Sequence, residues 1–411
     1  MKTIIRNRAT NAWGKVRVGD ALRLINGRAF KPSEWKERGL PIVRIQNLNN
    51  AEAPFNYYEG DLPEKFLLNN GDLLFAWSGT PGTSFGAHIW RGGKAWLNQH
   101  IFKVMFDVVD FNKKFLQLAI NQNLNEYIRA AHGGAGLAHI TKGKFEDSEL
   151  VKPPLEEQNL IVAEIEKQFS RRDEAVANLK RVKANLKRYK SAVLKAAVEG
   201  KLAPTAGPWK QVALGDVTTS IRNGYSKKPD AEQGTRIFRI SAVRTMKLDT
   251  NDVRYLSGTP ADYEPFLIEP GDVLFTRYNG NRDYVGVCAR VPASLPPTVY
   301  PDKLIRVRVP SSMLLPEFLV ILASTGRARE YIDSKIRTTA GQSGISGGDL
   351  KVLPLDIPRV TEQLQIVAEV ERRLSVIDEL ETAVKANLTR ADRLRQSILA
   401  RAFSGELATL Q

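Results

Sequence analysis

One segment of the sequence is repeated 205 residues further along the chain, and the two copies align without a gap. Residues 155–202 begin LEEQNLIVAEIE, residues 360–407 begin VTEQLQIVAEVE, and 16 of their 48 aligned positions are identical. Each copy closes on a glycine, at Gly200 and Gly405. Repetition at a fixed offset is typical of folds that use one structural unit more than once. The chain therefore has two halves, each with a longer block in front of its copy of the repeat.

The two longer blocks match each other only at scattered points. The clearest match is a Gly-Asp-Leu/Val-Leu-Phe run, at residues 71–75 of the first block and 271–275 of the second. Three further matches occur in the same order in both blocks. Trp13 and Gly19-Asp20 match Trp209 and Gly215-Asp216, and residues 42–45 match residues 237–240. The last match is between Gly136…Ile140-Thr141 and Gly341…Ile345-Ser346. Chance explains any one of them, but their common order indicates that the blocks are related.

Each repeated segment has the apolar spacing of one long amphipathic helix. In the second copy, apolar residues recur in steps of three and four from Leu364 through Leu380 and Leu394 to Ile398. The first copy carries a similar stripe, which Arg172 interrupts once. Prolines before each segment and glycines after it favour helix starts and stops there. The sequence predicts that the two helices pair as an antiparallel coiled coil. Packing of each helix on its own block is the alternative.

The blocks mix short β-type runs with helical ones, which predicts α+β domains. Strands are expected at residues 72–75, 100–106, 272–276 and 303–309, and helices at 115–129 and 316–335. The predicted fold has two mixed α/β domains separated by two long helices, with a pseudo-two-fold and a pseudo-circular order that returns the C-terminus near the N-terminus. The expected boundaries are 1–154, 155–202, 203–357 and 358–411.

The charge of the chain points to a polyanionic partner. Its 60 Lys+Arg against 45 Asp+Glu give a net charge of +15 and an isoelectric point of about 9.7. Residues 1–154 hold 21 basic against 14 acidic residues, residues 203–359 hold 21 against 16, and residues 360–411 hold 7 against 8. Basic side chains that neutralise phosphates release counterions, which favours nucleic acid as the partner of the two blocks. A merely basic soluble protein is the alternative.

The motifs of several enzyme classes are absent from the sequence. It has no G-x-x-x-x-G-K-[ST] phosphate loop, no strand-borne G-x-G-x-x-G and no Asn/Asp-Pro-Pro-aromatic tetrapeptide of amino-methyltransferases. The four histidines lack metal-ligand spacing, and the single cysteine, Cys288, excludes a disulfide within the chain. No apolar run approaches the length of a membrane span, and no signal peptide is visible. We expect a cytoplasmic protein without a catalytic or metal site.

This arrangement resembles the specificity subunit of type I restriction–modification systems. The resemblance rests on Glu157-Gln158…Ile161-Val162 and Glu362-Gln363…Ile366-Val367 after Pro-rich leads, on the Gly-Asp-Leu/Val-Leu-Phe runs, and on the alternation of variable blocks with repeated helices. It covers nearly the whole chain. It implies that residues 1–154 and 203–357 are target recognition domains and that the helices set the distance between them.

The resemblance also implies a function and partners. The chain would be a non-catalytic subunit that reads an asymmetric bipartite site on double-stranded DNA. Two modification subunits, which hold S-adenosylmethionine and methylate adenine, would dock on the helices, and restriction subunits would add the translocase and nuclease that use ATP and Mg. No cofactor is expected in this chain. Three alternatives stay open: a related system with methylase and nuclease in one partner chain, a nuclease or methyltransferase with an unfamiliar site, and a coiled-coil scaffold that does not touch DNA.

Candidate DNA-contacting residues lie in loops beside the matched strands. Arg, Lys, Asn and Gln side chains read base edges, and charge or backbone N–H groups hold phosphates. The candidates are Arg23, Arg28, Lys31, Trp77 and Ser78 in the first block, and Arg222, Asn223, Tyr225, Lys227, Lys228, Arg277, Tyr278, Asn279, Arg282 and Gln342 in the second. Each is also compatible with an ordinary surface role. Arg44 and Arg239, at matched positions predicted inside strands, fit a salt bridge as well as a phosphate contact.

Overall fold

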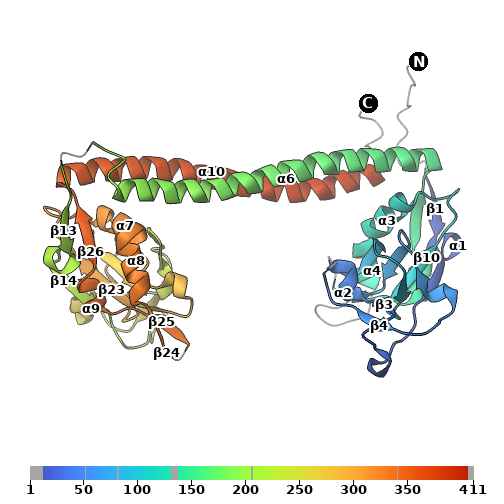
Figure 1. Ribbon diagram of the computed structural model, residues 1–411, viewed down its shortest axis with the longest axis horizontal. Coiled ribbons are helices and arrows are strands. Elements are labelled where there is room, and N and C mark those ends of the chain that lie inside the picture. The colour runs from blue at the N-terminus through green and yellow to red at the C-terminus, as the bar shows by residue number, and fades with distance from the viewer. Residues whose placement is uncertain are drawn as a thin grey trace, which may run out of the picture. The chain divides into compact units, whose positions relative to one another are not determined.

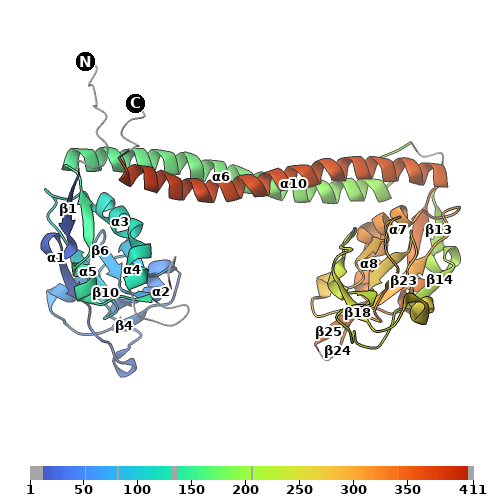
Figure 2. The ribbon, with the colours of Figure 1, turned by 180° about the vertical axis from the view of Figure 1, so that it is seen from behind.

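The computed structural model describes residues 13–50, 52–80, 83–130, 138–204, 207–339 and 341–405. The chain forms two compact units, one of Met1–Asn178 with Asn387–Gln411 and the other of Leu179–Ala386. Each unit holds one mixed-sheet domain together with part of each of two long helices, α6 (Leu155–Val198) and α10 (Val360–Phe403) (Figures 1 and 2). Among the described residues, no helix is both long and apolar enough to cross a membrane.

The first domain is built on two four-stranded sheets. One is antiparallel, in the order β2 (Arg23–Asn26), β10 (Ile101–Met105), β6 (Leu73–Ala76), β8 (Gly86–Ile89). The other has the order β4 (Asn56–Tyr58), β3 (Leu40–Val43), β9 (Ala95–Leu97), β5 (Leu67–Leu68), with β3 and β9 parallel. Two-stranded ladders join β1 (Gly14–Arg17) to β12 (Glu149–Lys152) and β7 (Ser78–Gly79) to β11 (Ala138–His139). The helices are α1 (Val18–Ala21), α2 (Ile45–Asn49), α3 (Lys113–Gln122), α4 (Leu124–Ala130) and α5 (Lys142–Glu146).

The second domain repeats this plan. Its main sheet has the order β14 (Ser220–Asn223), β23 (Leu304–Arg308), β19 (Val273–Thr276), β21 (Cys288–Arg290). A second sheet has the order β18 (Val253–Leu256), β15 (Thr235–Phe238), β22 (Thr298–Val299). Smaller sheets contain β13 (Lys210–Ala213) with β26 (Pro354–Ile357), β16 (Val243–Arg244) with β17 (Lys247–Leu248), and β20 (Tyr278–Asn279), β25 (Gln342–Gly344) and β24 (Arg337–Thr339). The helices are α7 (Pro316–Ser324), α8 (Gly326–Lys335) and α9 (Gly347–Lys351). The scattered sequence matches therefore mark one shared fold.

Short 3-10 turns connect several of these elements. They are η2 (Pro32–Glu34), η3 (Glu64–Phe66), η4 (Leu214–Val217), η5 (Ile240–Ala242), η6 (Pro260–Phe266) and η7 (Arg282–Tyr284). Arg44 and Arg239 lie beyond the ends of β3 and β15, before α2 and η5, so the prediction that they stand inside strands was wrong. Pairing ends at Arg44 because its backbone N–H donates to the Asn47 side chain, at 3.0 Å.

The predicted strands are confirmed as β6, β10, β19 and β23, but each predicted domain helix is two helices. The first breaks at Asn123, between α3 and α4, and the second at Thr325, between α7 and α8. Thr325 is extended, with φ −157° and ψ 168°, and Gly326 follows with a φ of 61°. A left-handed backbone favours glycine, so Gly326 was the visible signal. The apolar spacing did not reveal either break, because α3 and α4, like α7 and α8, both bury apolar residues on either side of it.

Both long helices end where the sequence predicts. Each has 44 residues, and the glycine two positions after each helix, Gly200 or Gly405, has a φ of 68° or 78°. After α6, the Lys201 N–H donates to the Ala196 carbonyl at 2.8 Å and the Gly200 N–H to the Ala197 carbonyl at 3.3 Å. This is the Schellman arrangement, in which a left-handed glycine lets the chain return its N–H groups to the last turn.

A buried glutamine fixes the start of each long helix to its domain. The Gln158 side-chain oxygen accepts from the Asn112 N–H at 2.9 Å, and its nitrogen donates to the carbonyls of Asp110 and Pro153, both at 2.9 Å. Gln363 makes the same three kinds of bond. Its partners are the Leu315 N–H at 2.8 Å, the Met313 carbonyl at 2.9 Å and the Pro358 carbonyl at 3.0 Å. The Glu-Gln signature therefore joins each helix to the loop before α3 or α7.

The core of the first unit contains side chains from both long helices. Ile161 of α6 and Ile398 of α10 lie in one apolar cluster with Phe115 of α3. The Phe403 ring of α10 stands 5.4 Å from the Phe115 ring. The last turns of α10 are therefore part of the core of a domain that begins almost four hundred residues earlier in the sequence.

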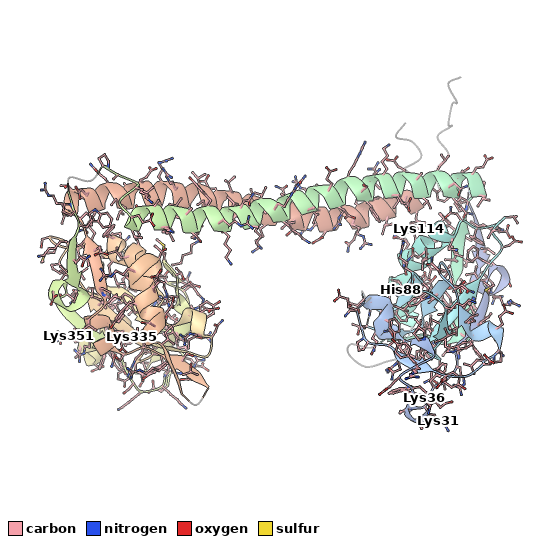
Figure 3. The ribbon with its side chains drawn as sticks, in the orientation of Figure 1. Lys31, Lys36, His88, Lys114, Lys335 and Lys351 are labelled. Atoms are coloured by element: carbon pink, nitrogen blue, oxygen red, sulfur yellow. The ribbon has the colours of Figure 1, made fainter. Side chains whose placement is uncertain are left out.

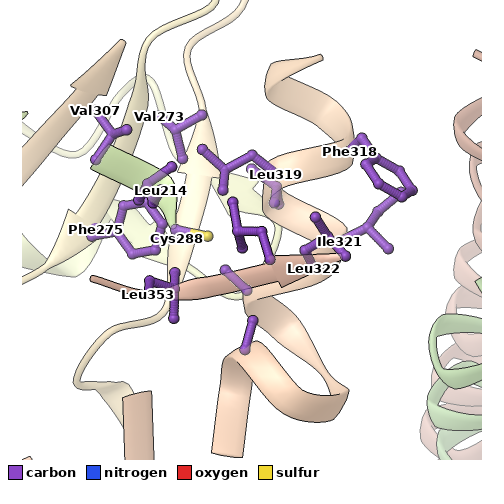
Figure 4. Close-up of a cluster of buried hydrophobic side chains, with 14 of the residues drawn as sticks. Leu214, Val273, Phe275, Cys288, Val307, Phe318, Leu319, Ile321, Leu322 and Leu353 are labelled. Atoms are coloured by element: carbon purple, nitrogen blue, oxygen red, sulfur yellow. The ribbon is translucent and has the colours of Figure 1, made fainter. Parts of the chain in front are cut away.

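The core of the second unit is built in the same way. Val193 and Ala197, near the end of α6, join Ile366 of α10 and the α7 residues Phe318 and Leu319 in one cluster. Figure 4 shows α7 and the β19 side chains facing each other in this cluster. Each helix thus packs on a domain and on the other helix, which combines the two arrangements considered from the sequence.

The apolar stripes of α6 and α10 are only partly buried where the helices pack on each other and on the domains. Leu364, Leu380 and Leu394 are each about half exposed, although they belong to the predicted stripe of α10. Arg172, which interrupts the stripe of α6, contacts α10 within the first unit: its Nε donates to the Ala391 carbonyl and its Nη2 pairs with Asp392, both at 2.9 Å. The partner helix therefore compensates for the charge in the stripe.

His88 is a half-buried titratable group in the first domain. It lies on β8 (Figure 3), and its Nε2 is 3.0 Å from the Ser84 carbonyl oxygen. Burial lowers the pKa of His88 below the usual 6.5, and the hydrogen bond to Ser84 opposes this shift only in part. The folded domain therefore favours the neutral imidazole.

Replacing Gln363 by alanine should lower the free energy of unfolding of the second unit by about 2–4 kcal/mol, because a buried N–H and two carbonyls lose their partner. Gln365→Ala, an exposed position on the same helix, should change it by less than about 0.5 kcal/mol. Urea denaturation, with hydrogen exchange of α7 as the local probe, measures both. Equal effects of the two substitutions would contradict this role of Gln363.

Ile398→Ala should destabilise the first unit by about 2–4 kcal/mol, because it leaves a cavity in that core. Hydrogen exchange should show reduced protection in α3 and β10 and unchanged protection in α7. Leu394→Ala, on the more exposed side of the same helix, is the matched control and should have a much smaller effect. Loss of protection confined to the second unit would contradict the placement of Ile398 in the core of the first unit.

Acidification should destabilise the first unit partly through His88. Because its folded pKa is lowered, the unfolded chain binds the proton more readily below the usual pKa of 6.5. The stability that neutral His88 contributes is complete above that pH and is lost as the pH falls below it. His88→Gln keeps a donor for Ser84 but does not titrate, so its urea midpoint should fall less than that of the wild type between about pH 7.5 and 5.5. If the urea midpoints of the variant and the wild type fell equally, the pH dependence would not come from His88.

Candidate DNA interface

The loops that follow the Gly-Asp strands occupy the same backbone position in both domains. In the first, the Trp77 N–H donates to the His100 carbonyl at 3.3 Å, and the Ile140 N–H donates to the Trp77 carbonyl at 3.0 Å. In the second, the Arg277 N–H donates to the Lys303 carbonyl at 2.8 Å, and the Ile345 N–H donates to the Arg277 carbonyl at 2.9 Å. One backbone hydrogen-bond pattern therefore presents Trp77 in one domain and Arg277 in the other.

The cluster around Trp77 is aromatic. The indole Nε1 donates to the Asn26 side chain at 3.3 Å, and the ring centroid lies 5.2 Å from His100 and 4.7 Å from His139. Burial lowers the pKa of His100, and the charges of His139 and Arg44 lower it further. Such a cluster offers amide and imidazole hydrogen bonds and an aromatic face, which suit base edges and a thymine methyl group.

The cluster around Arg277 is cationic. The Arg277 guanidinium lies 4.6 Å from the centre of the Tyr278 ring, and its Nη1 donates to the Asp302 carbonyl at 3.3 Å. Its Nε is buried without a hydrogen-bond partner among the described residues. Lys303, whose carbonyl accepts from the Arg277 N–H, is exposed just before β23, and Asn223 is exposed at the end of β14. These groups suit guanine or phosphate.

Some candidates are held by contacts within their own domain. Arg28 pairs with Glu34, and its guanidinium lies 4.7 Å and 5.0 Å from the rings of Phe30 and Tyr58. A hydrogen bond from the Lys31 N–H, and then the one from Arg28, lower the pKa of Glu34. These bonds shape the loop after β2 and keep the Arg28 side chain mostly covered.

Further candidates of the second domain are also in contact with neighbours. The Tyr225 ring packs edge-on against Tyr263 at 5.2 Å and Phe266 at 5.5 Å. Arg222 is exposed and places its guanidinium 5.0 Å from the Phe266 ring. Arg282 donates to carbonyls near the end of α8, at 2.9 Å and 3.4 Å. Tyr225 and Arg282 therefore support loops, whereas Arg222 keeps a face open to solvent.

The remaining candidates differ in exposure. Ser78 is buried in the short ladder of β7 with β11, and Asn279 accepts a hydrogen bond from the Asn281 N–H at 2.9 Å. Arg23 begins β2, at the other end of the strand from Asn26. Exposed candidates without a described side-chain contact to a neighbouring element are Lys31, Lys227, Lys228 and Gln342. Figure 3 shows Lys31 and Lys36 at the end of the first domain farthest from α6.

Sequence reasoning missed several residues that the structure brings to these clusters. His100 and Lys303 precede β10 and β23 and support Trp77 and Arg277 through their backbones. Arg337 lies on β24, a strand that was not predicted, next to β25 and Gln342. A β-type run of three residues before a glycine turn was the available signal. In the first domain, residues 131–137, including the matched Gly136, lie outside the described residues.

A metal or thiol site is not found in the part of the chain that the structure describes. No group of three or more His, Cys, Asp or Glu side chains there could hold a metal ion. Cys288 is fully buried, and burial raises the pKa of its thiol to about 12, which disfavours the reactive thiolate.

Among the matches of the sequence with known proteins, a family match and a match to a single protein differ in extent. The family described as "Type I restriction modification DNA specificity domain" matches residues 11–183. The Type I restriction enzyme EcoKI specificity subunit of Escherichia coli (strain K12) is 37% identical over 421 residues, which cover 96% of this chain and 89% of that protein. This match spans both domains and both long helices.

Solved structures share the fold over the full length. A chain from a study of complex assembly and conformational transition of the type I R-M system has a TM-score of 0.74 at 18% identity, covering 98% of this chain and 100% of that one. The HsdS subunit from Thermoanaerobacter tengcongensis has a TM-score of 0.61 at 19% identity, covering 98% and 99%. They confirm the predicted fold class of two mixed-sheet domains with two long helices packed together. With the sequence match, this shows that the chain belongs to the family of type I restriction enzyme specificity subunits.

Proposed function

We propose that this specificity subunit reads an asymmetric bipartite site on double-stranded DNA, with one half-site for each domain. As a specificity subunit it determines the recognition sequence of a methyltransferase and restriction complex and is itself non-catalytic. The observation that carries the proposal is the matched backbone position after β6 and β19, which presents Trp77 in one domain and Arg277 in the other. Two domains that share a backbone but present different side chains favour two half-sites that differ in sequence and are separated by a fixed spacing.

Each cluster would contribute base contacts suited to its chemistry. In the first domain these come from Trp77 and its neighbours Asn26, His100 and His139. In the second they come from Arg277, Tyr278, Asn279, Asn223 and Gln342. Phosphate contacts would come from exposed cations: Arg23, Lys31, Arg222, Lys227 and Lys228. Arg28, Ser78, Tyr225 and Arg282 would act by holding the reading loops in place, because their side chains are already engaged or buried.

The long helices would bind two modification subunits. In the first unit Leu160 and Leu394 are about half exposed, and in the second Leu364, Val376 and Leu380 are. Apolar side chains in these numbers on a charged helix surface favour contact with protein, and the near-neutral charge of residues 360–411 agrees with it. S-adenosylmethionine, ATP and Mg would then be held by the modification and restriction subunits, and the complex would work in the cytoplasm.

Co-expression with its modification partner in a host that lacks DNA methylation should produce a split, asymmetric methyl-adenine motif. Sequencing of the host DNA with detection of modified bases reads the motif directly. Trp77→Ala and Arg277→Ala should each relax or abolish one half of the motif, because one good base contact contributes about 1–3 kcal/mol of discrimination.

The partner without this chain is the control and should give no motif. A methylation pattern that does not depend on this chain would overturn the proposal, and an unsplit or symmetric motif would overturn the assignment of one half-site to each domain. The same motif would arise if one partner chain carried methylase and nuclease together, and the subunit composition of the purified complex separates these two arrangements.

A further inference from the structure

The three-stranded sheet β20–β25–β24 places Arg337 beside the cluster around Arg277. Arg337 pairs with Gly344 across β24 and β25, and Gly344 pairs with Tyr278 across β25 and β20. Strands β24 and β25 form a narrow ribbon at the end of the second domain farthest from α7 and the long helices of its unit (Figure 1). Paired residues on neighbouring strands point to the same face, so Arg337, Gly344 and Tyr278 form one row.

Gly344 makes room for the Tyr278 ring within this row. A Cβ atom added at Gly344 would lie 2.3 Å from a carbon of the ring, so the ring covers the glycine and extends toward β24. The Arg277 guanidinium lies 4.6 Å from the centre of the same ring. Gln342, two residues before Gly344 on β25, shares this face because side chains alternate along a strand. The face therefore combines an aromatic ring, two guanidinium groups and an amide.

Arg337 differs from the other arginines near this cluster in having its side chain available. It is exposed, and its guanidinium has no hydrogen bond or ion pair among the described residues. The carboxylate of Asp349 attracts it at longer range. Arg277 and Arg282, by contrast, donate to backbone carbonyls. An exposed guanidinium without such partners keeps its planar set of donors for an external acceptor.

We infer that Arg337 reads a guanine in the half-site of the second domain. The major groove of B-DNA admits a two-stranded β-ribbon, and the guanidinium fork matches the O6 and N7 acceptors that guanine presents there. Gln342 on the same face would lie against a neighbouring base pair, and the Tyr278 ring would limit the orientations open to the guanidinium. This inference rests on the proposed function, because it names the base and the residue that one domain uses.

The test uses the full chain in complex with its modification partner. In the Arg337→Ala variant, the methylation motif should lose its requirement for guanine at one position of one half-site, and the other half should be unchanged. Affinity for the cognate site should fall roughly tenfold or more, as expected for loss of a bidentate base contact. Arg337→Lys should relax the same position, because an ammonium keeps the charge without the fork.

A modified base tests the contact at the level of atoms. Replacing the guanine at that position by 7-deazaguanine removes the N7 acceptor, so the wild-type complex should bind the modified site more weakly than the natural one. The Arg337→Ala complex should bind both sites equally. Arg327→Ala is the matched control, since Arg327 lies at the other end of α8 and pairs with Asp356 at 3.3 Å; its motif should be that of the wild type.

Three results would overturn the inference. They are an unchanged motif in Arg337→Ala, relaxation at an A·T pair, and uniform weakening at every sequence with a salt slope smaller by about one, which marks a phosphate contact. Each of these leaves a chain-dependent split motif in place and so leaves the proposed function standing. Failure of the proposed function is a separate outcome, in which the wild-type chain itself directs no motif.

Discussion

The buried side chains of Gln158 and Gln363 determine how the long helices are attached to the domains. Each carboxamide uses its oxygen and its nitrogen in three hydrogen bonds, to the proline-rich lead of its helix and to the loop before α3 or α7. A buried amide that lost these partners would be strongly unfavourable, so the direction in which each helix leaves its domain is well defined. The packing of α6 and α10 on the domain cores follows from that direction.

The two domains share one backbone arrangement and differ in the side chains that it presents. The strands, the Gly-Asp turns and the hydrogen bonds of the Trp77 and Arg277 backbones are common to both, whereas the side chains at the matched positions differ in size, charge and aromatic character. Backbone hydrogen bonds do not depend on the side chain that a residue carries. Side chains can therefore change at these positions without loss of the loop conformation, as in a fold that serves many target sequences.

The repeat and its apolar spacing were enough to predict the long helices and their glycine ends. Short β-type runs in the two blocks predicted strands β6, β10, β19 and β23, because these features also depend on local sequence. The breaks at Asn123 and Thr325 were missed because burial continues across them. The loops around Trp77 and Arg277 could be predicted from their place after matched strands. The positions of His100 and His139 next to Trp77 in the first domain, and of Arg337 next to β25 in the second, could not be predicted. They depend on pairings between segments that are separated in the sequence.

The contribution of α10 to the core of the first domain has a consequence for protein synthesis. Phe115 and its neighbours are translated first, but Ile398 and Phe403, which cover them, follow about 280 residues later in the sequence. At the usual rates of protein synthesis the interval is on the order of ten seconds or more. During that time the first domain exposes apolar surface on the ribosome. A nascent chain that stops before α10 therefore stays a target for chaperones and proteases, because its first core lacks Ile398 and Phe403.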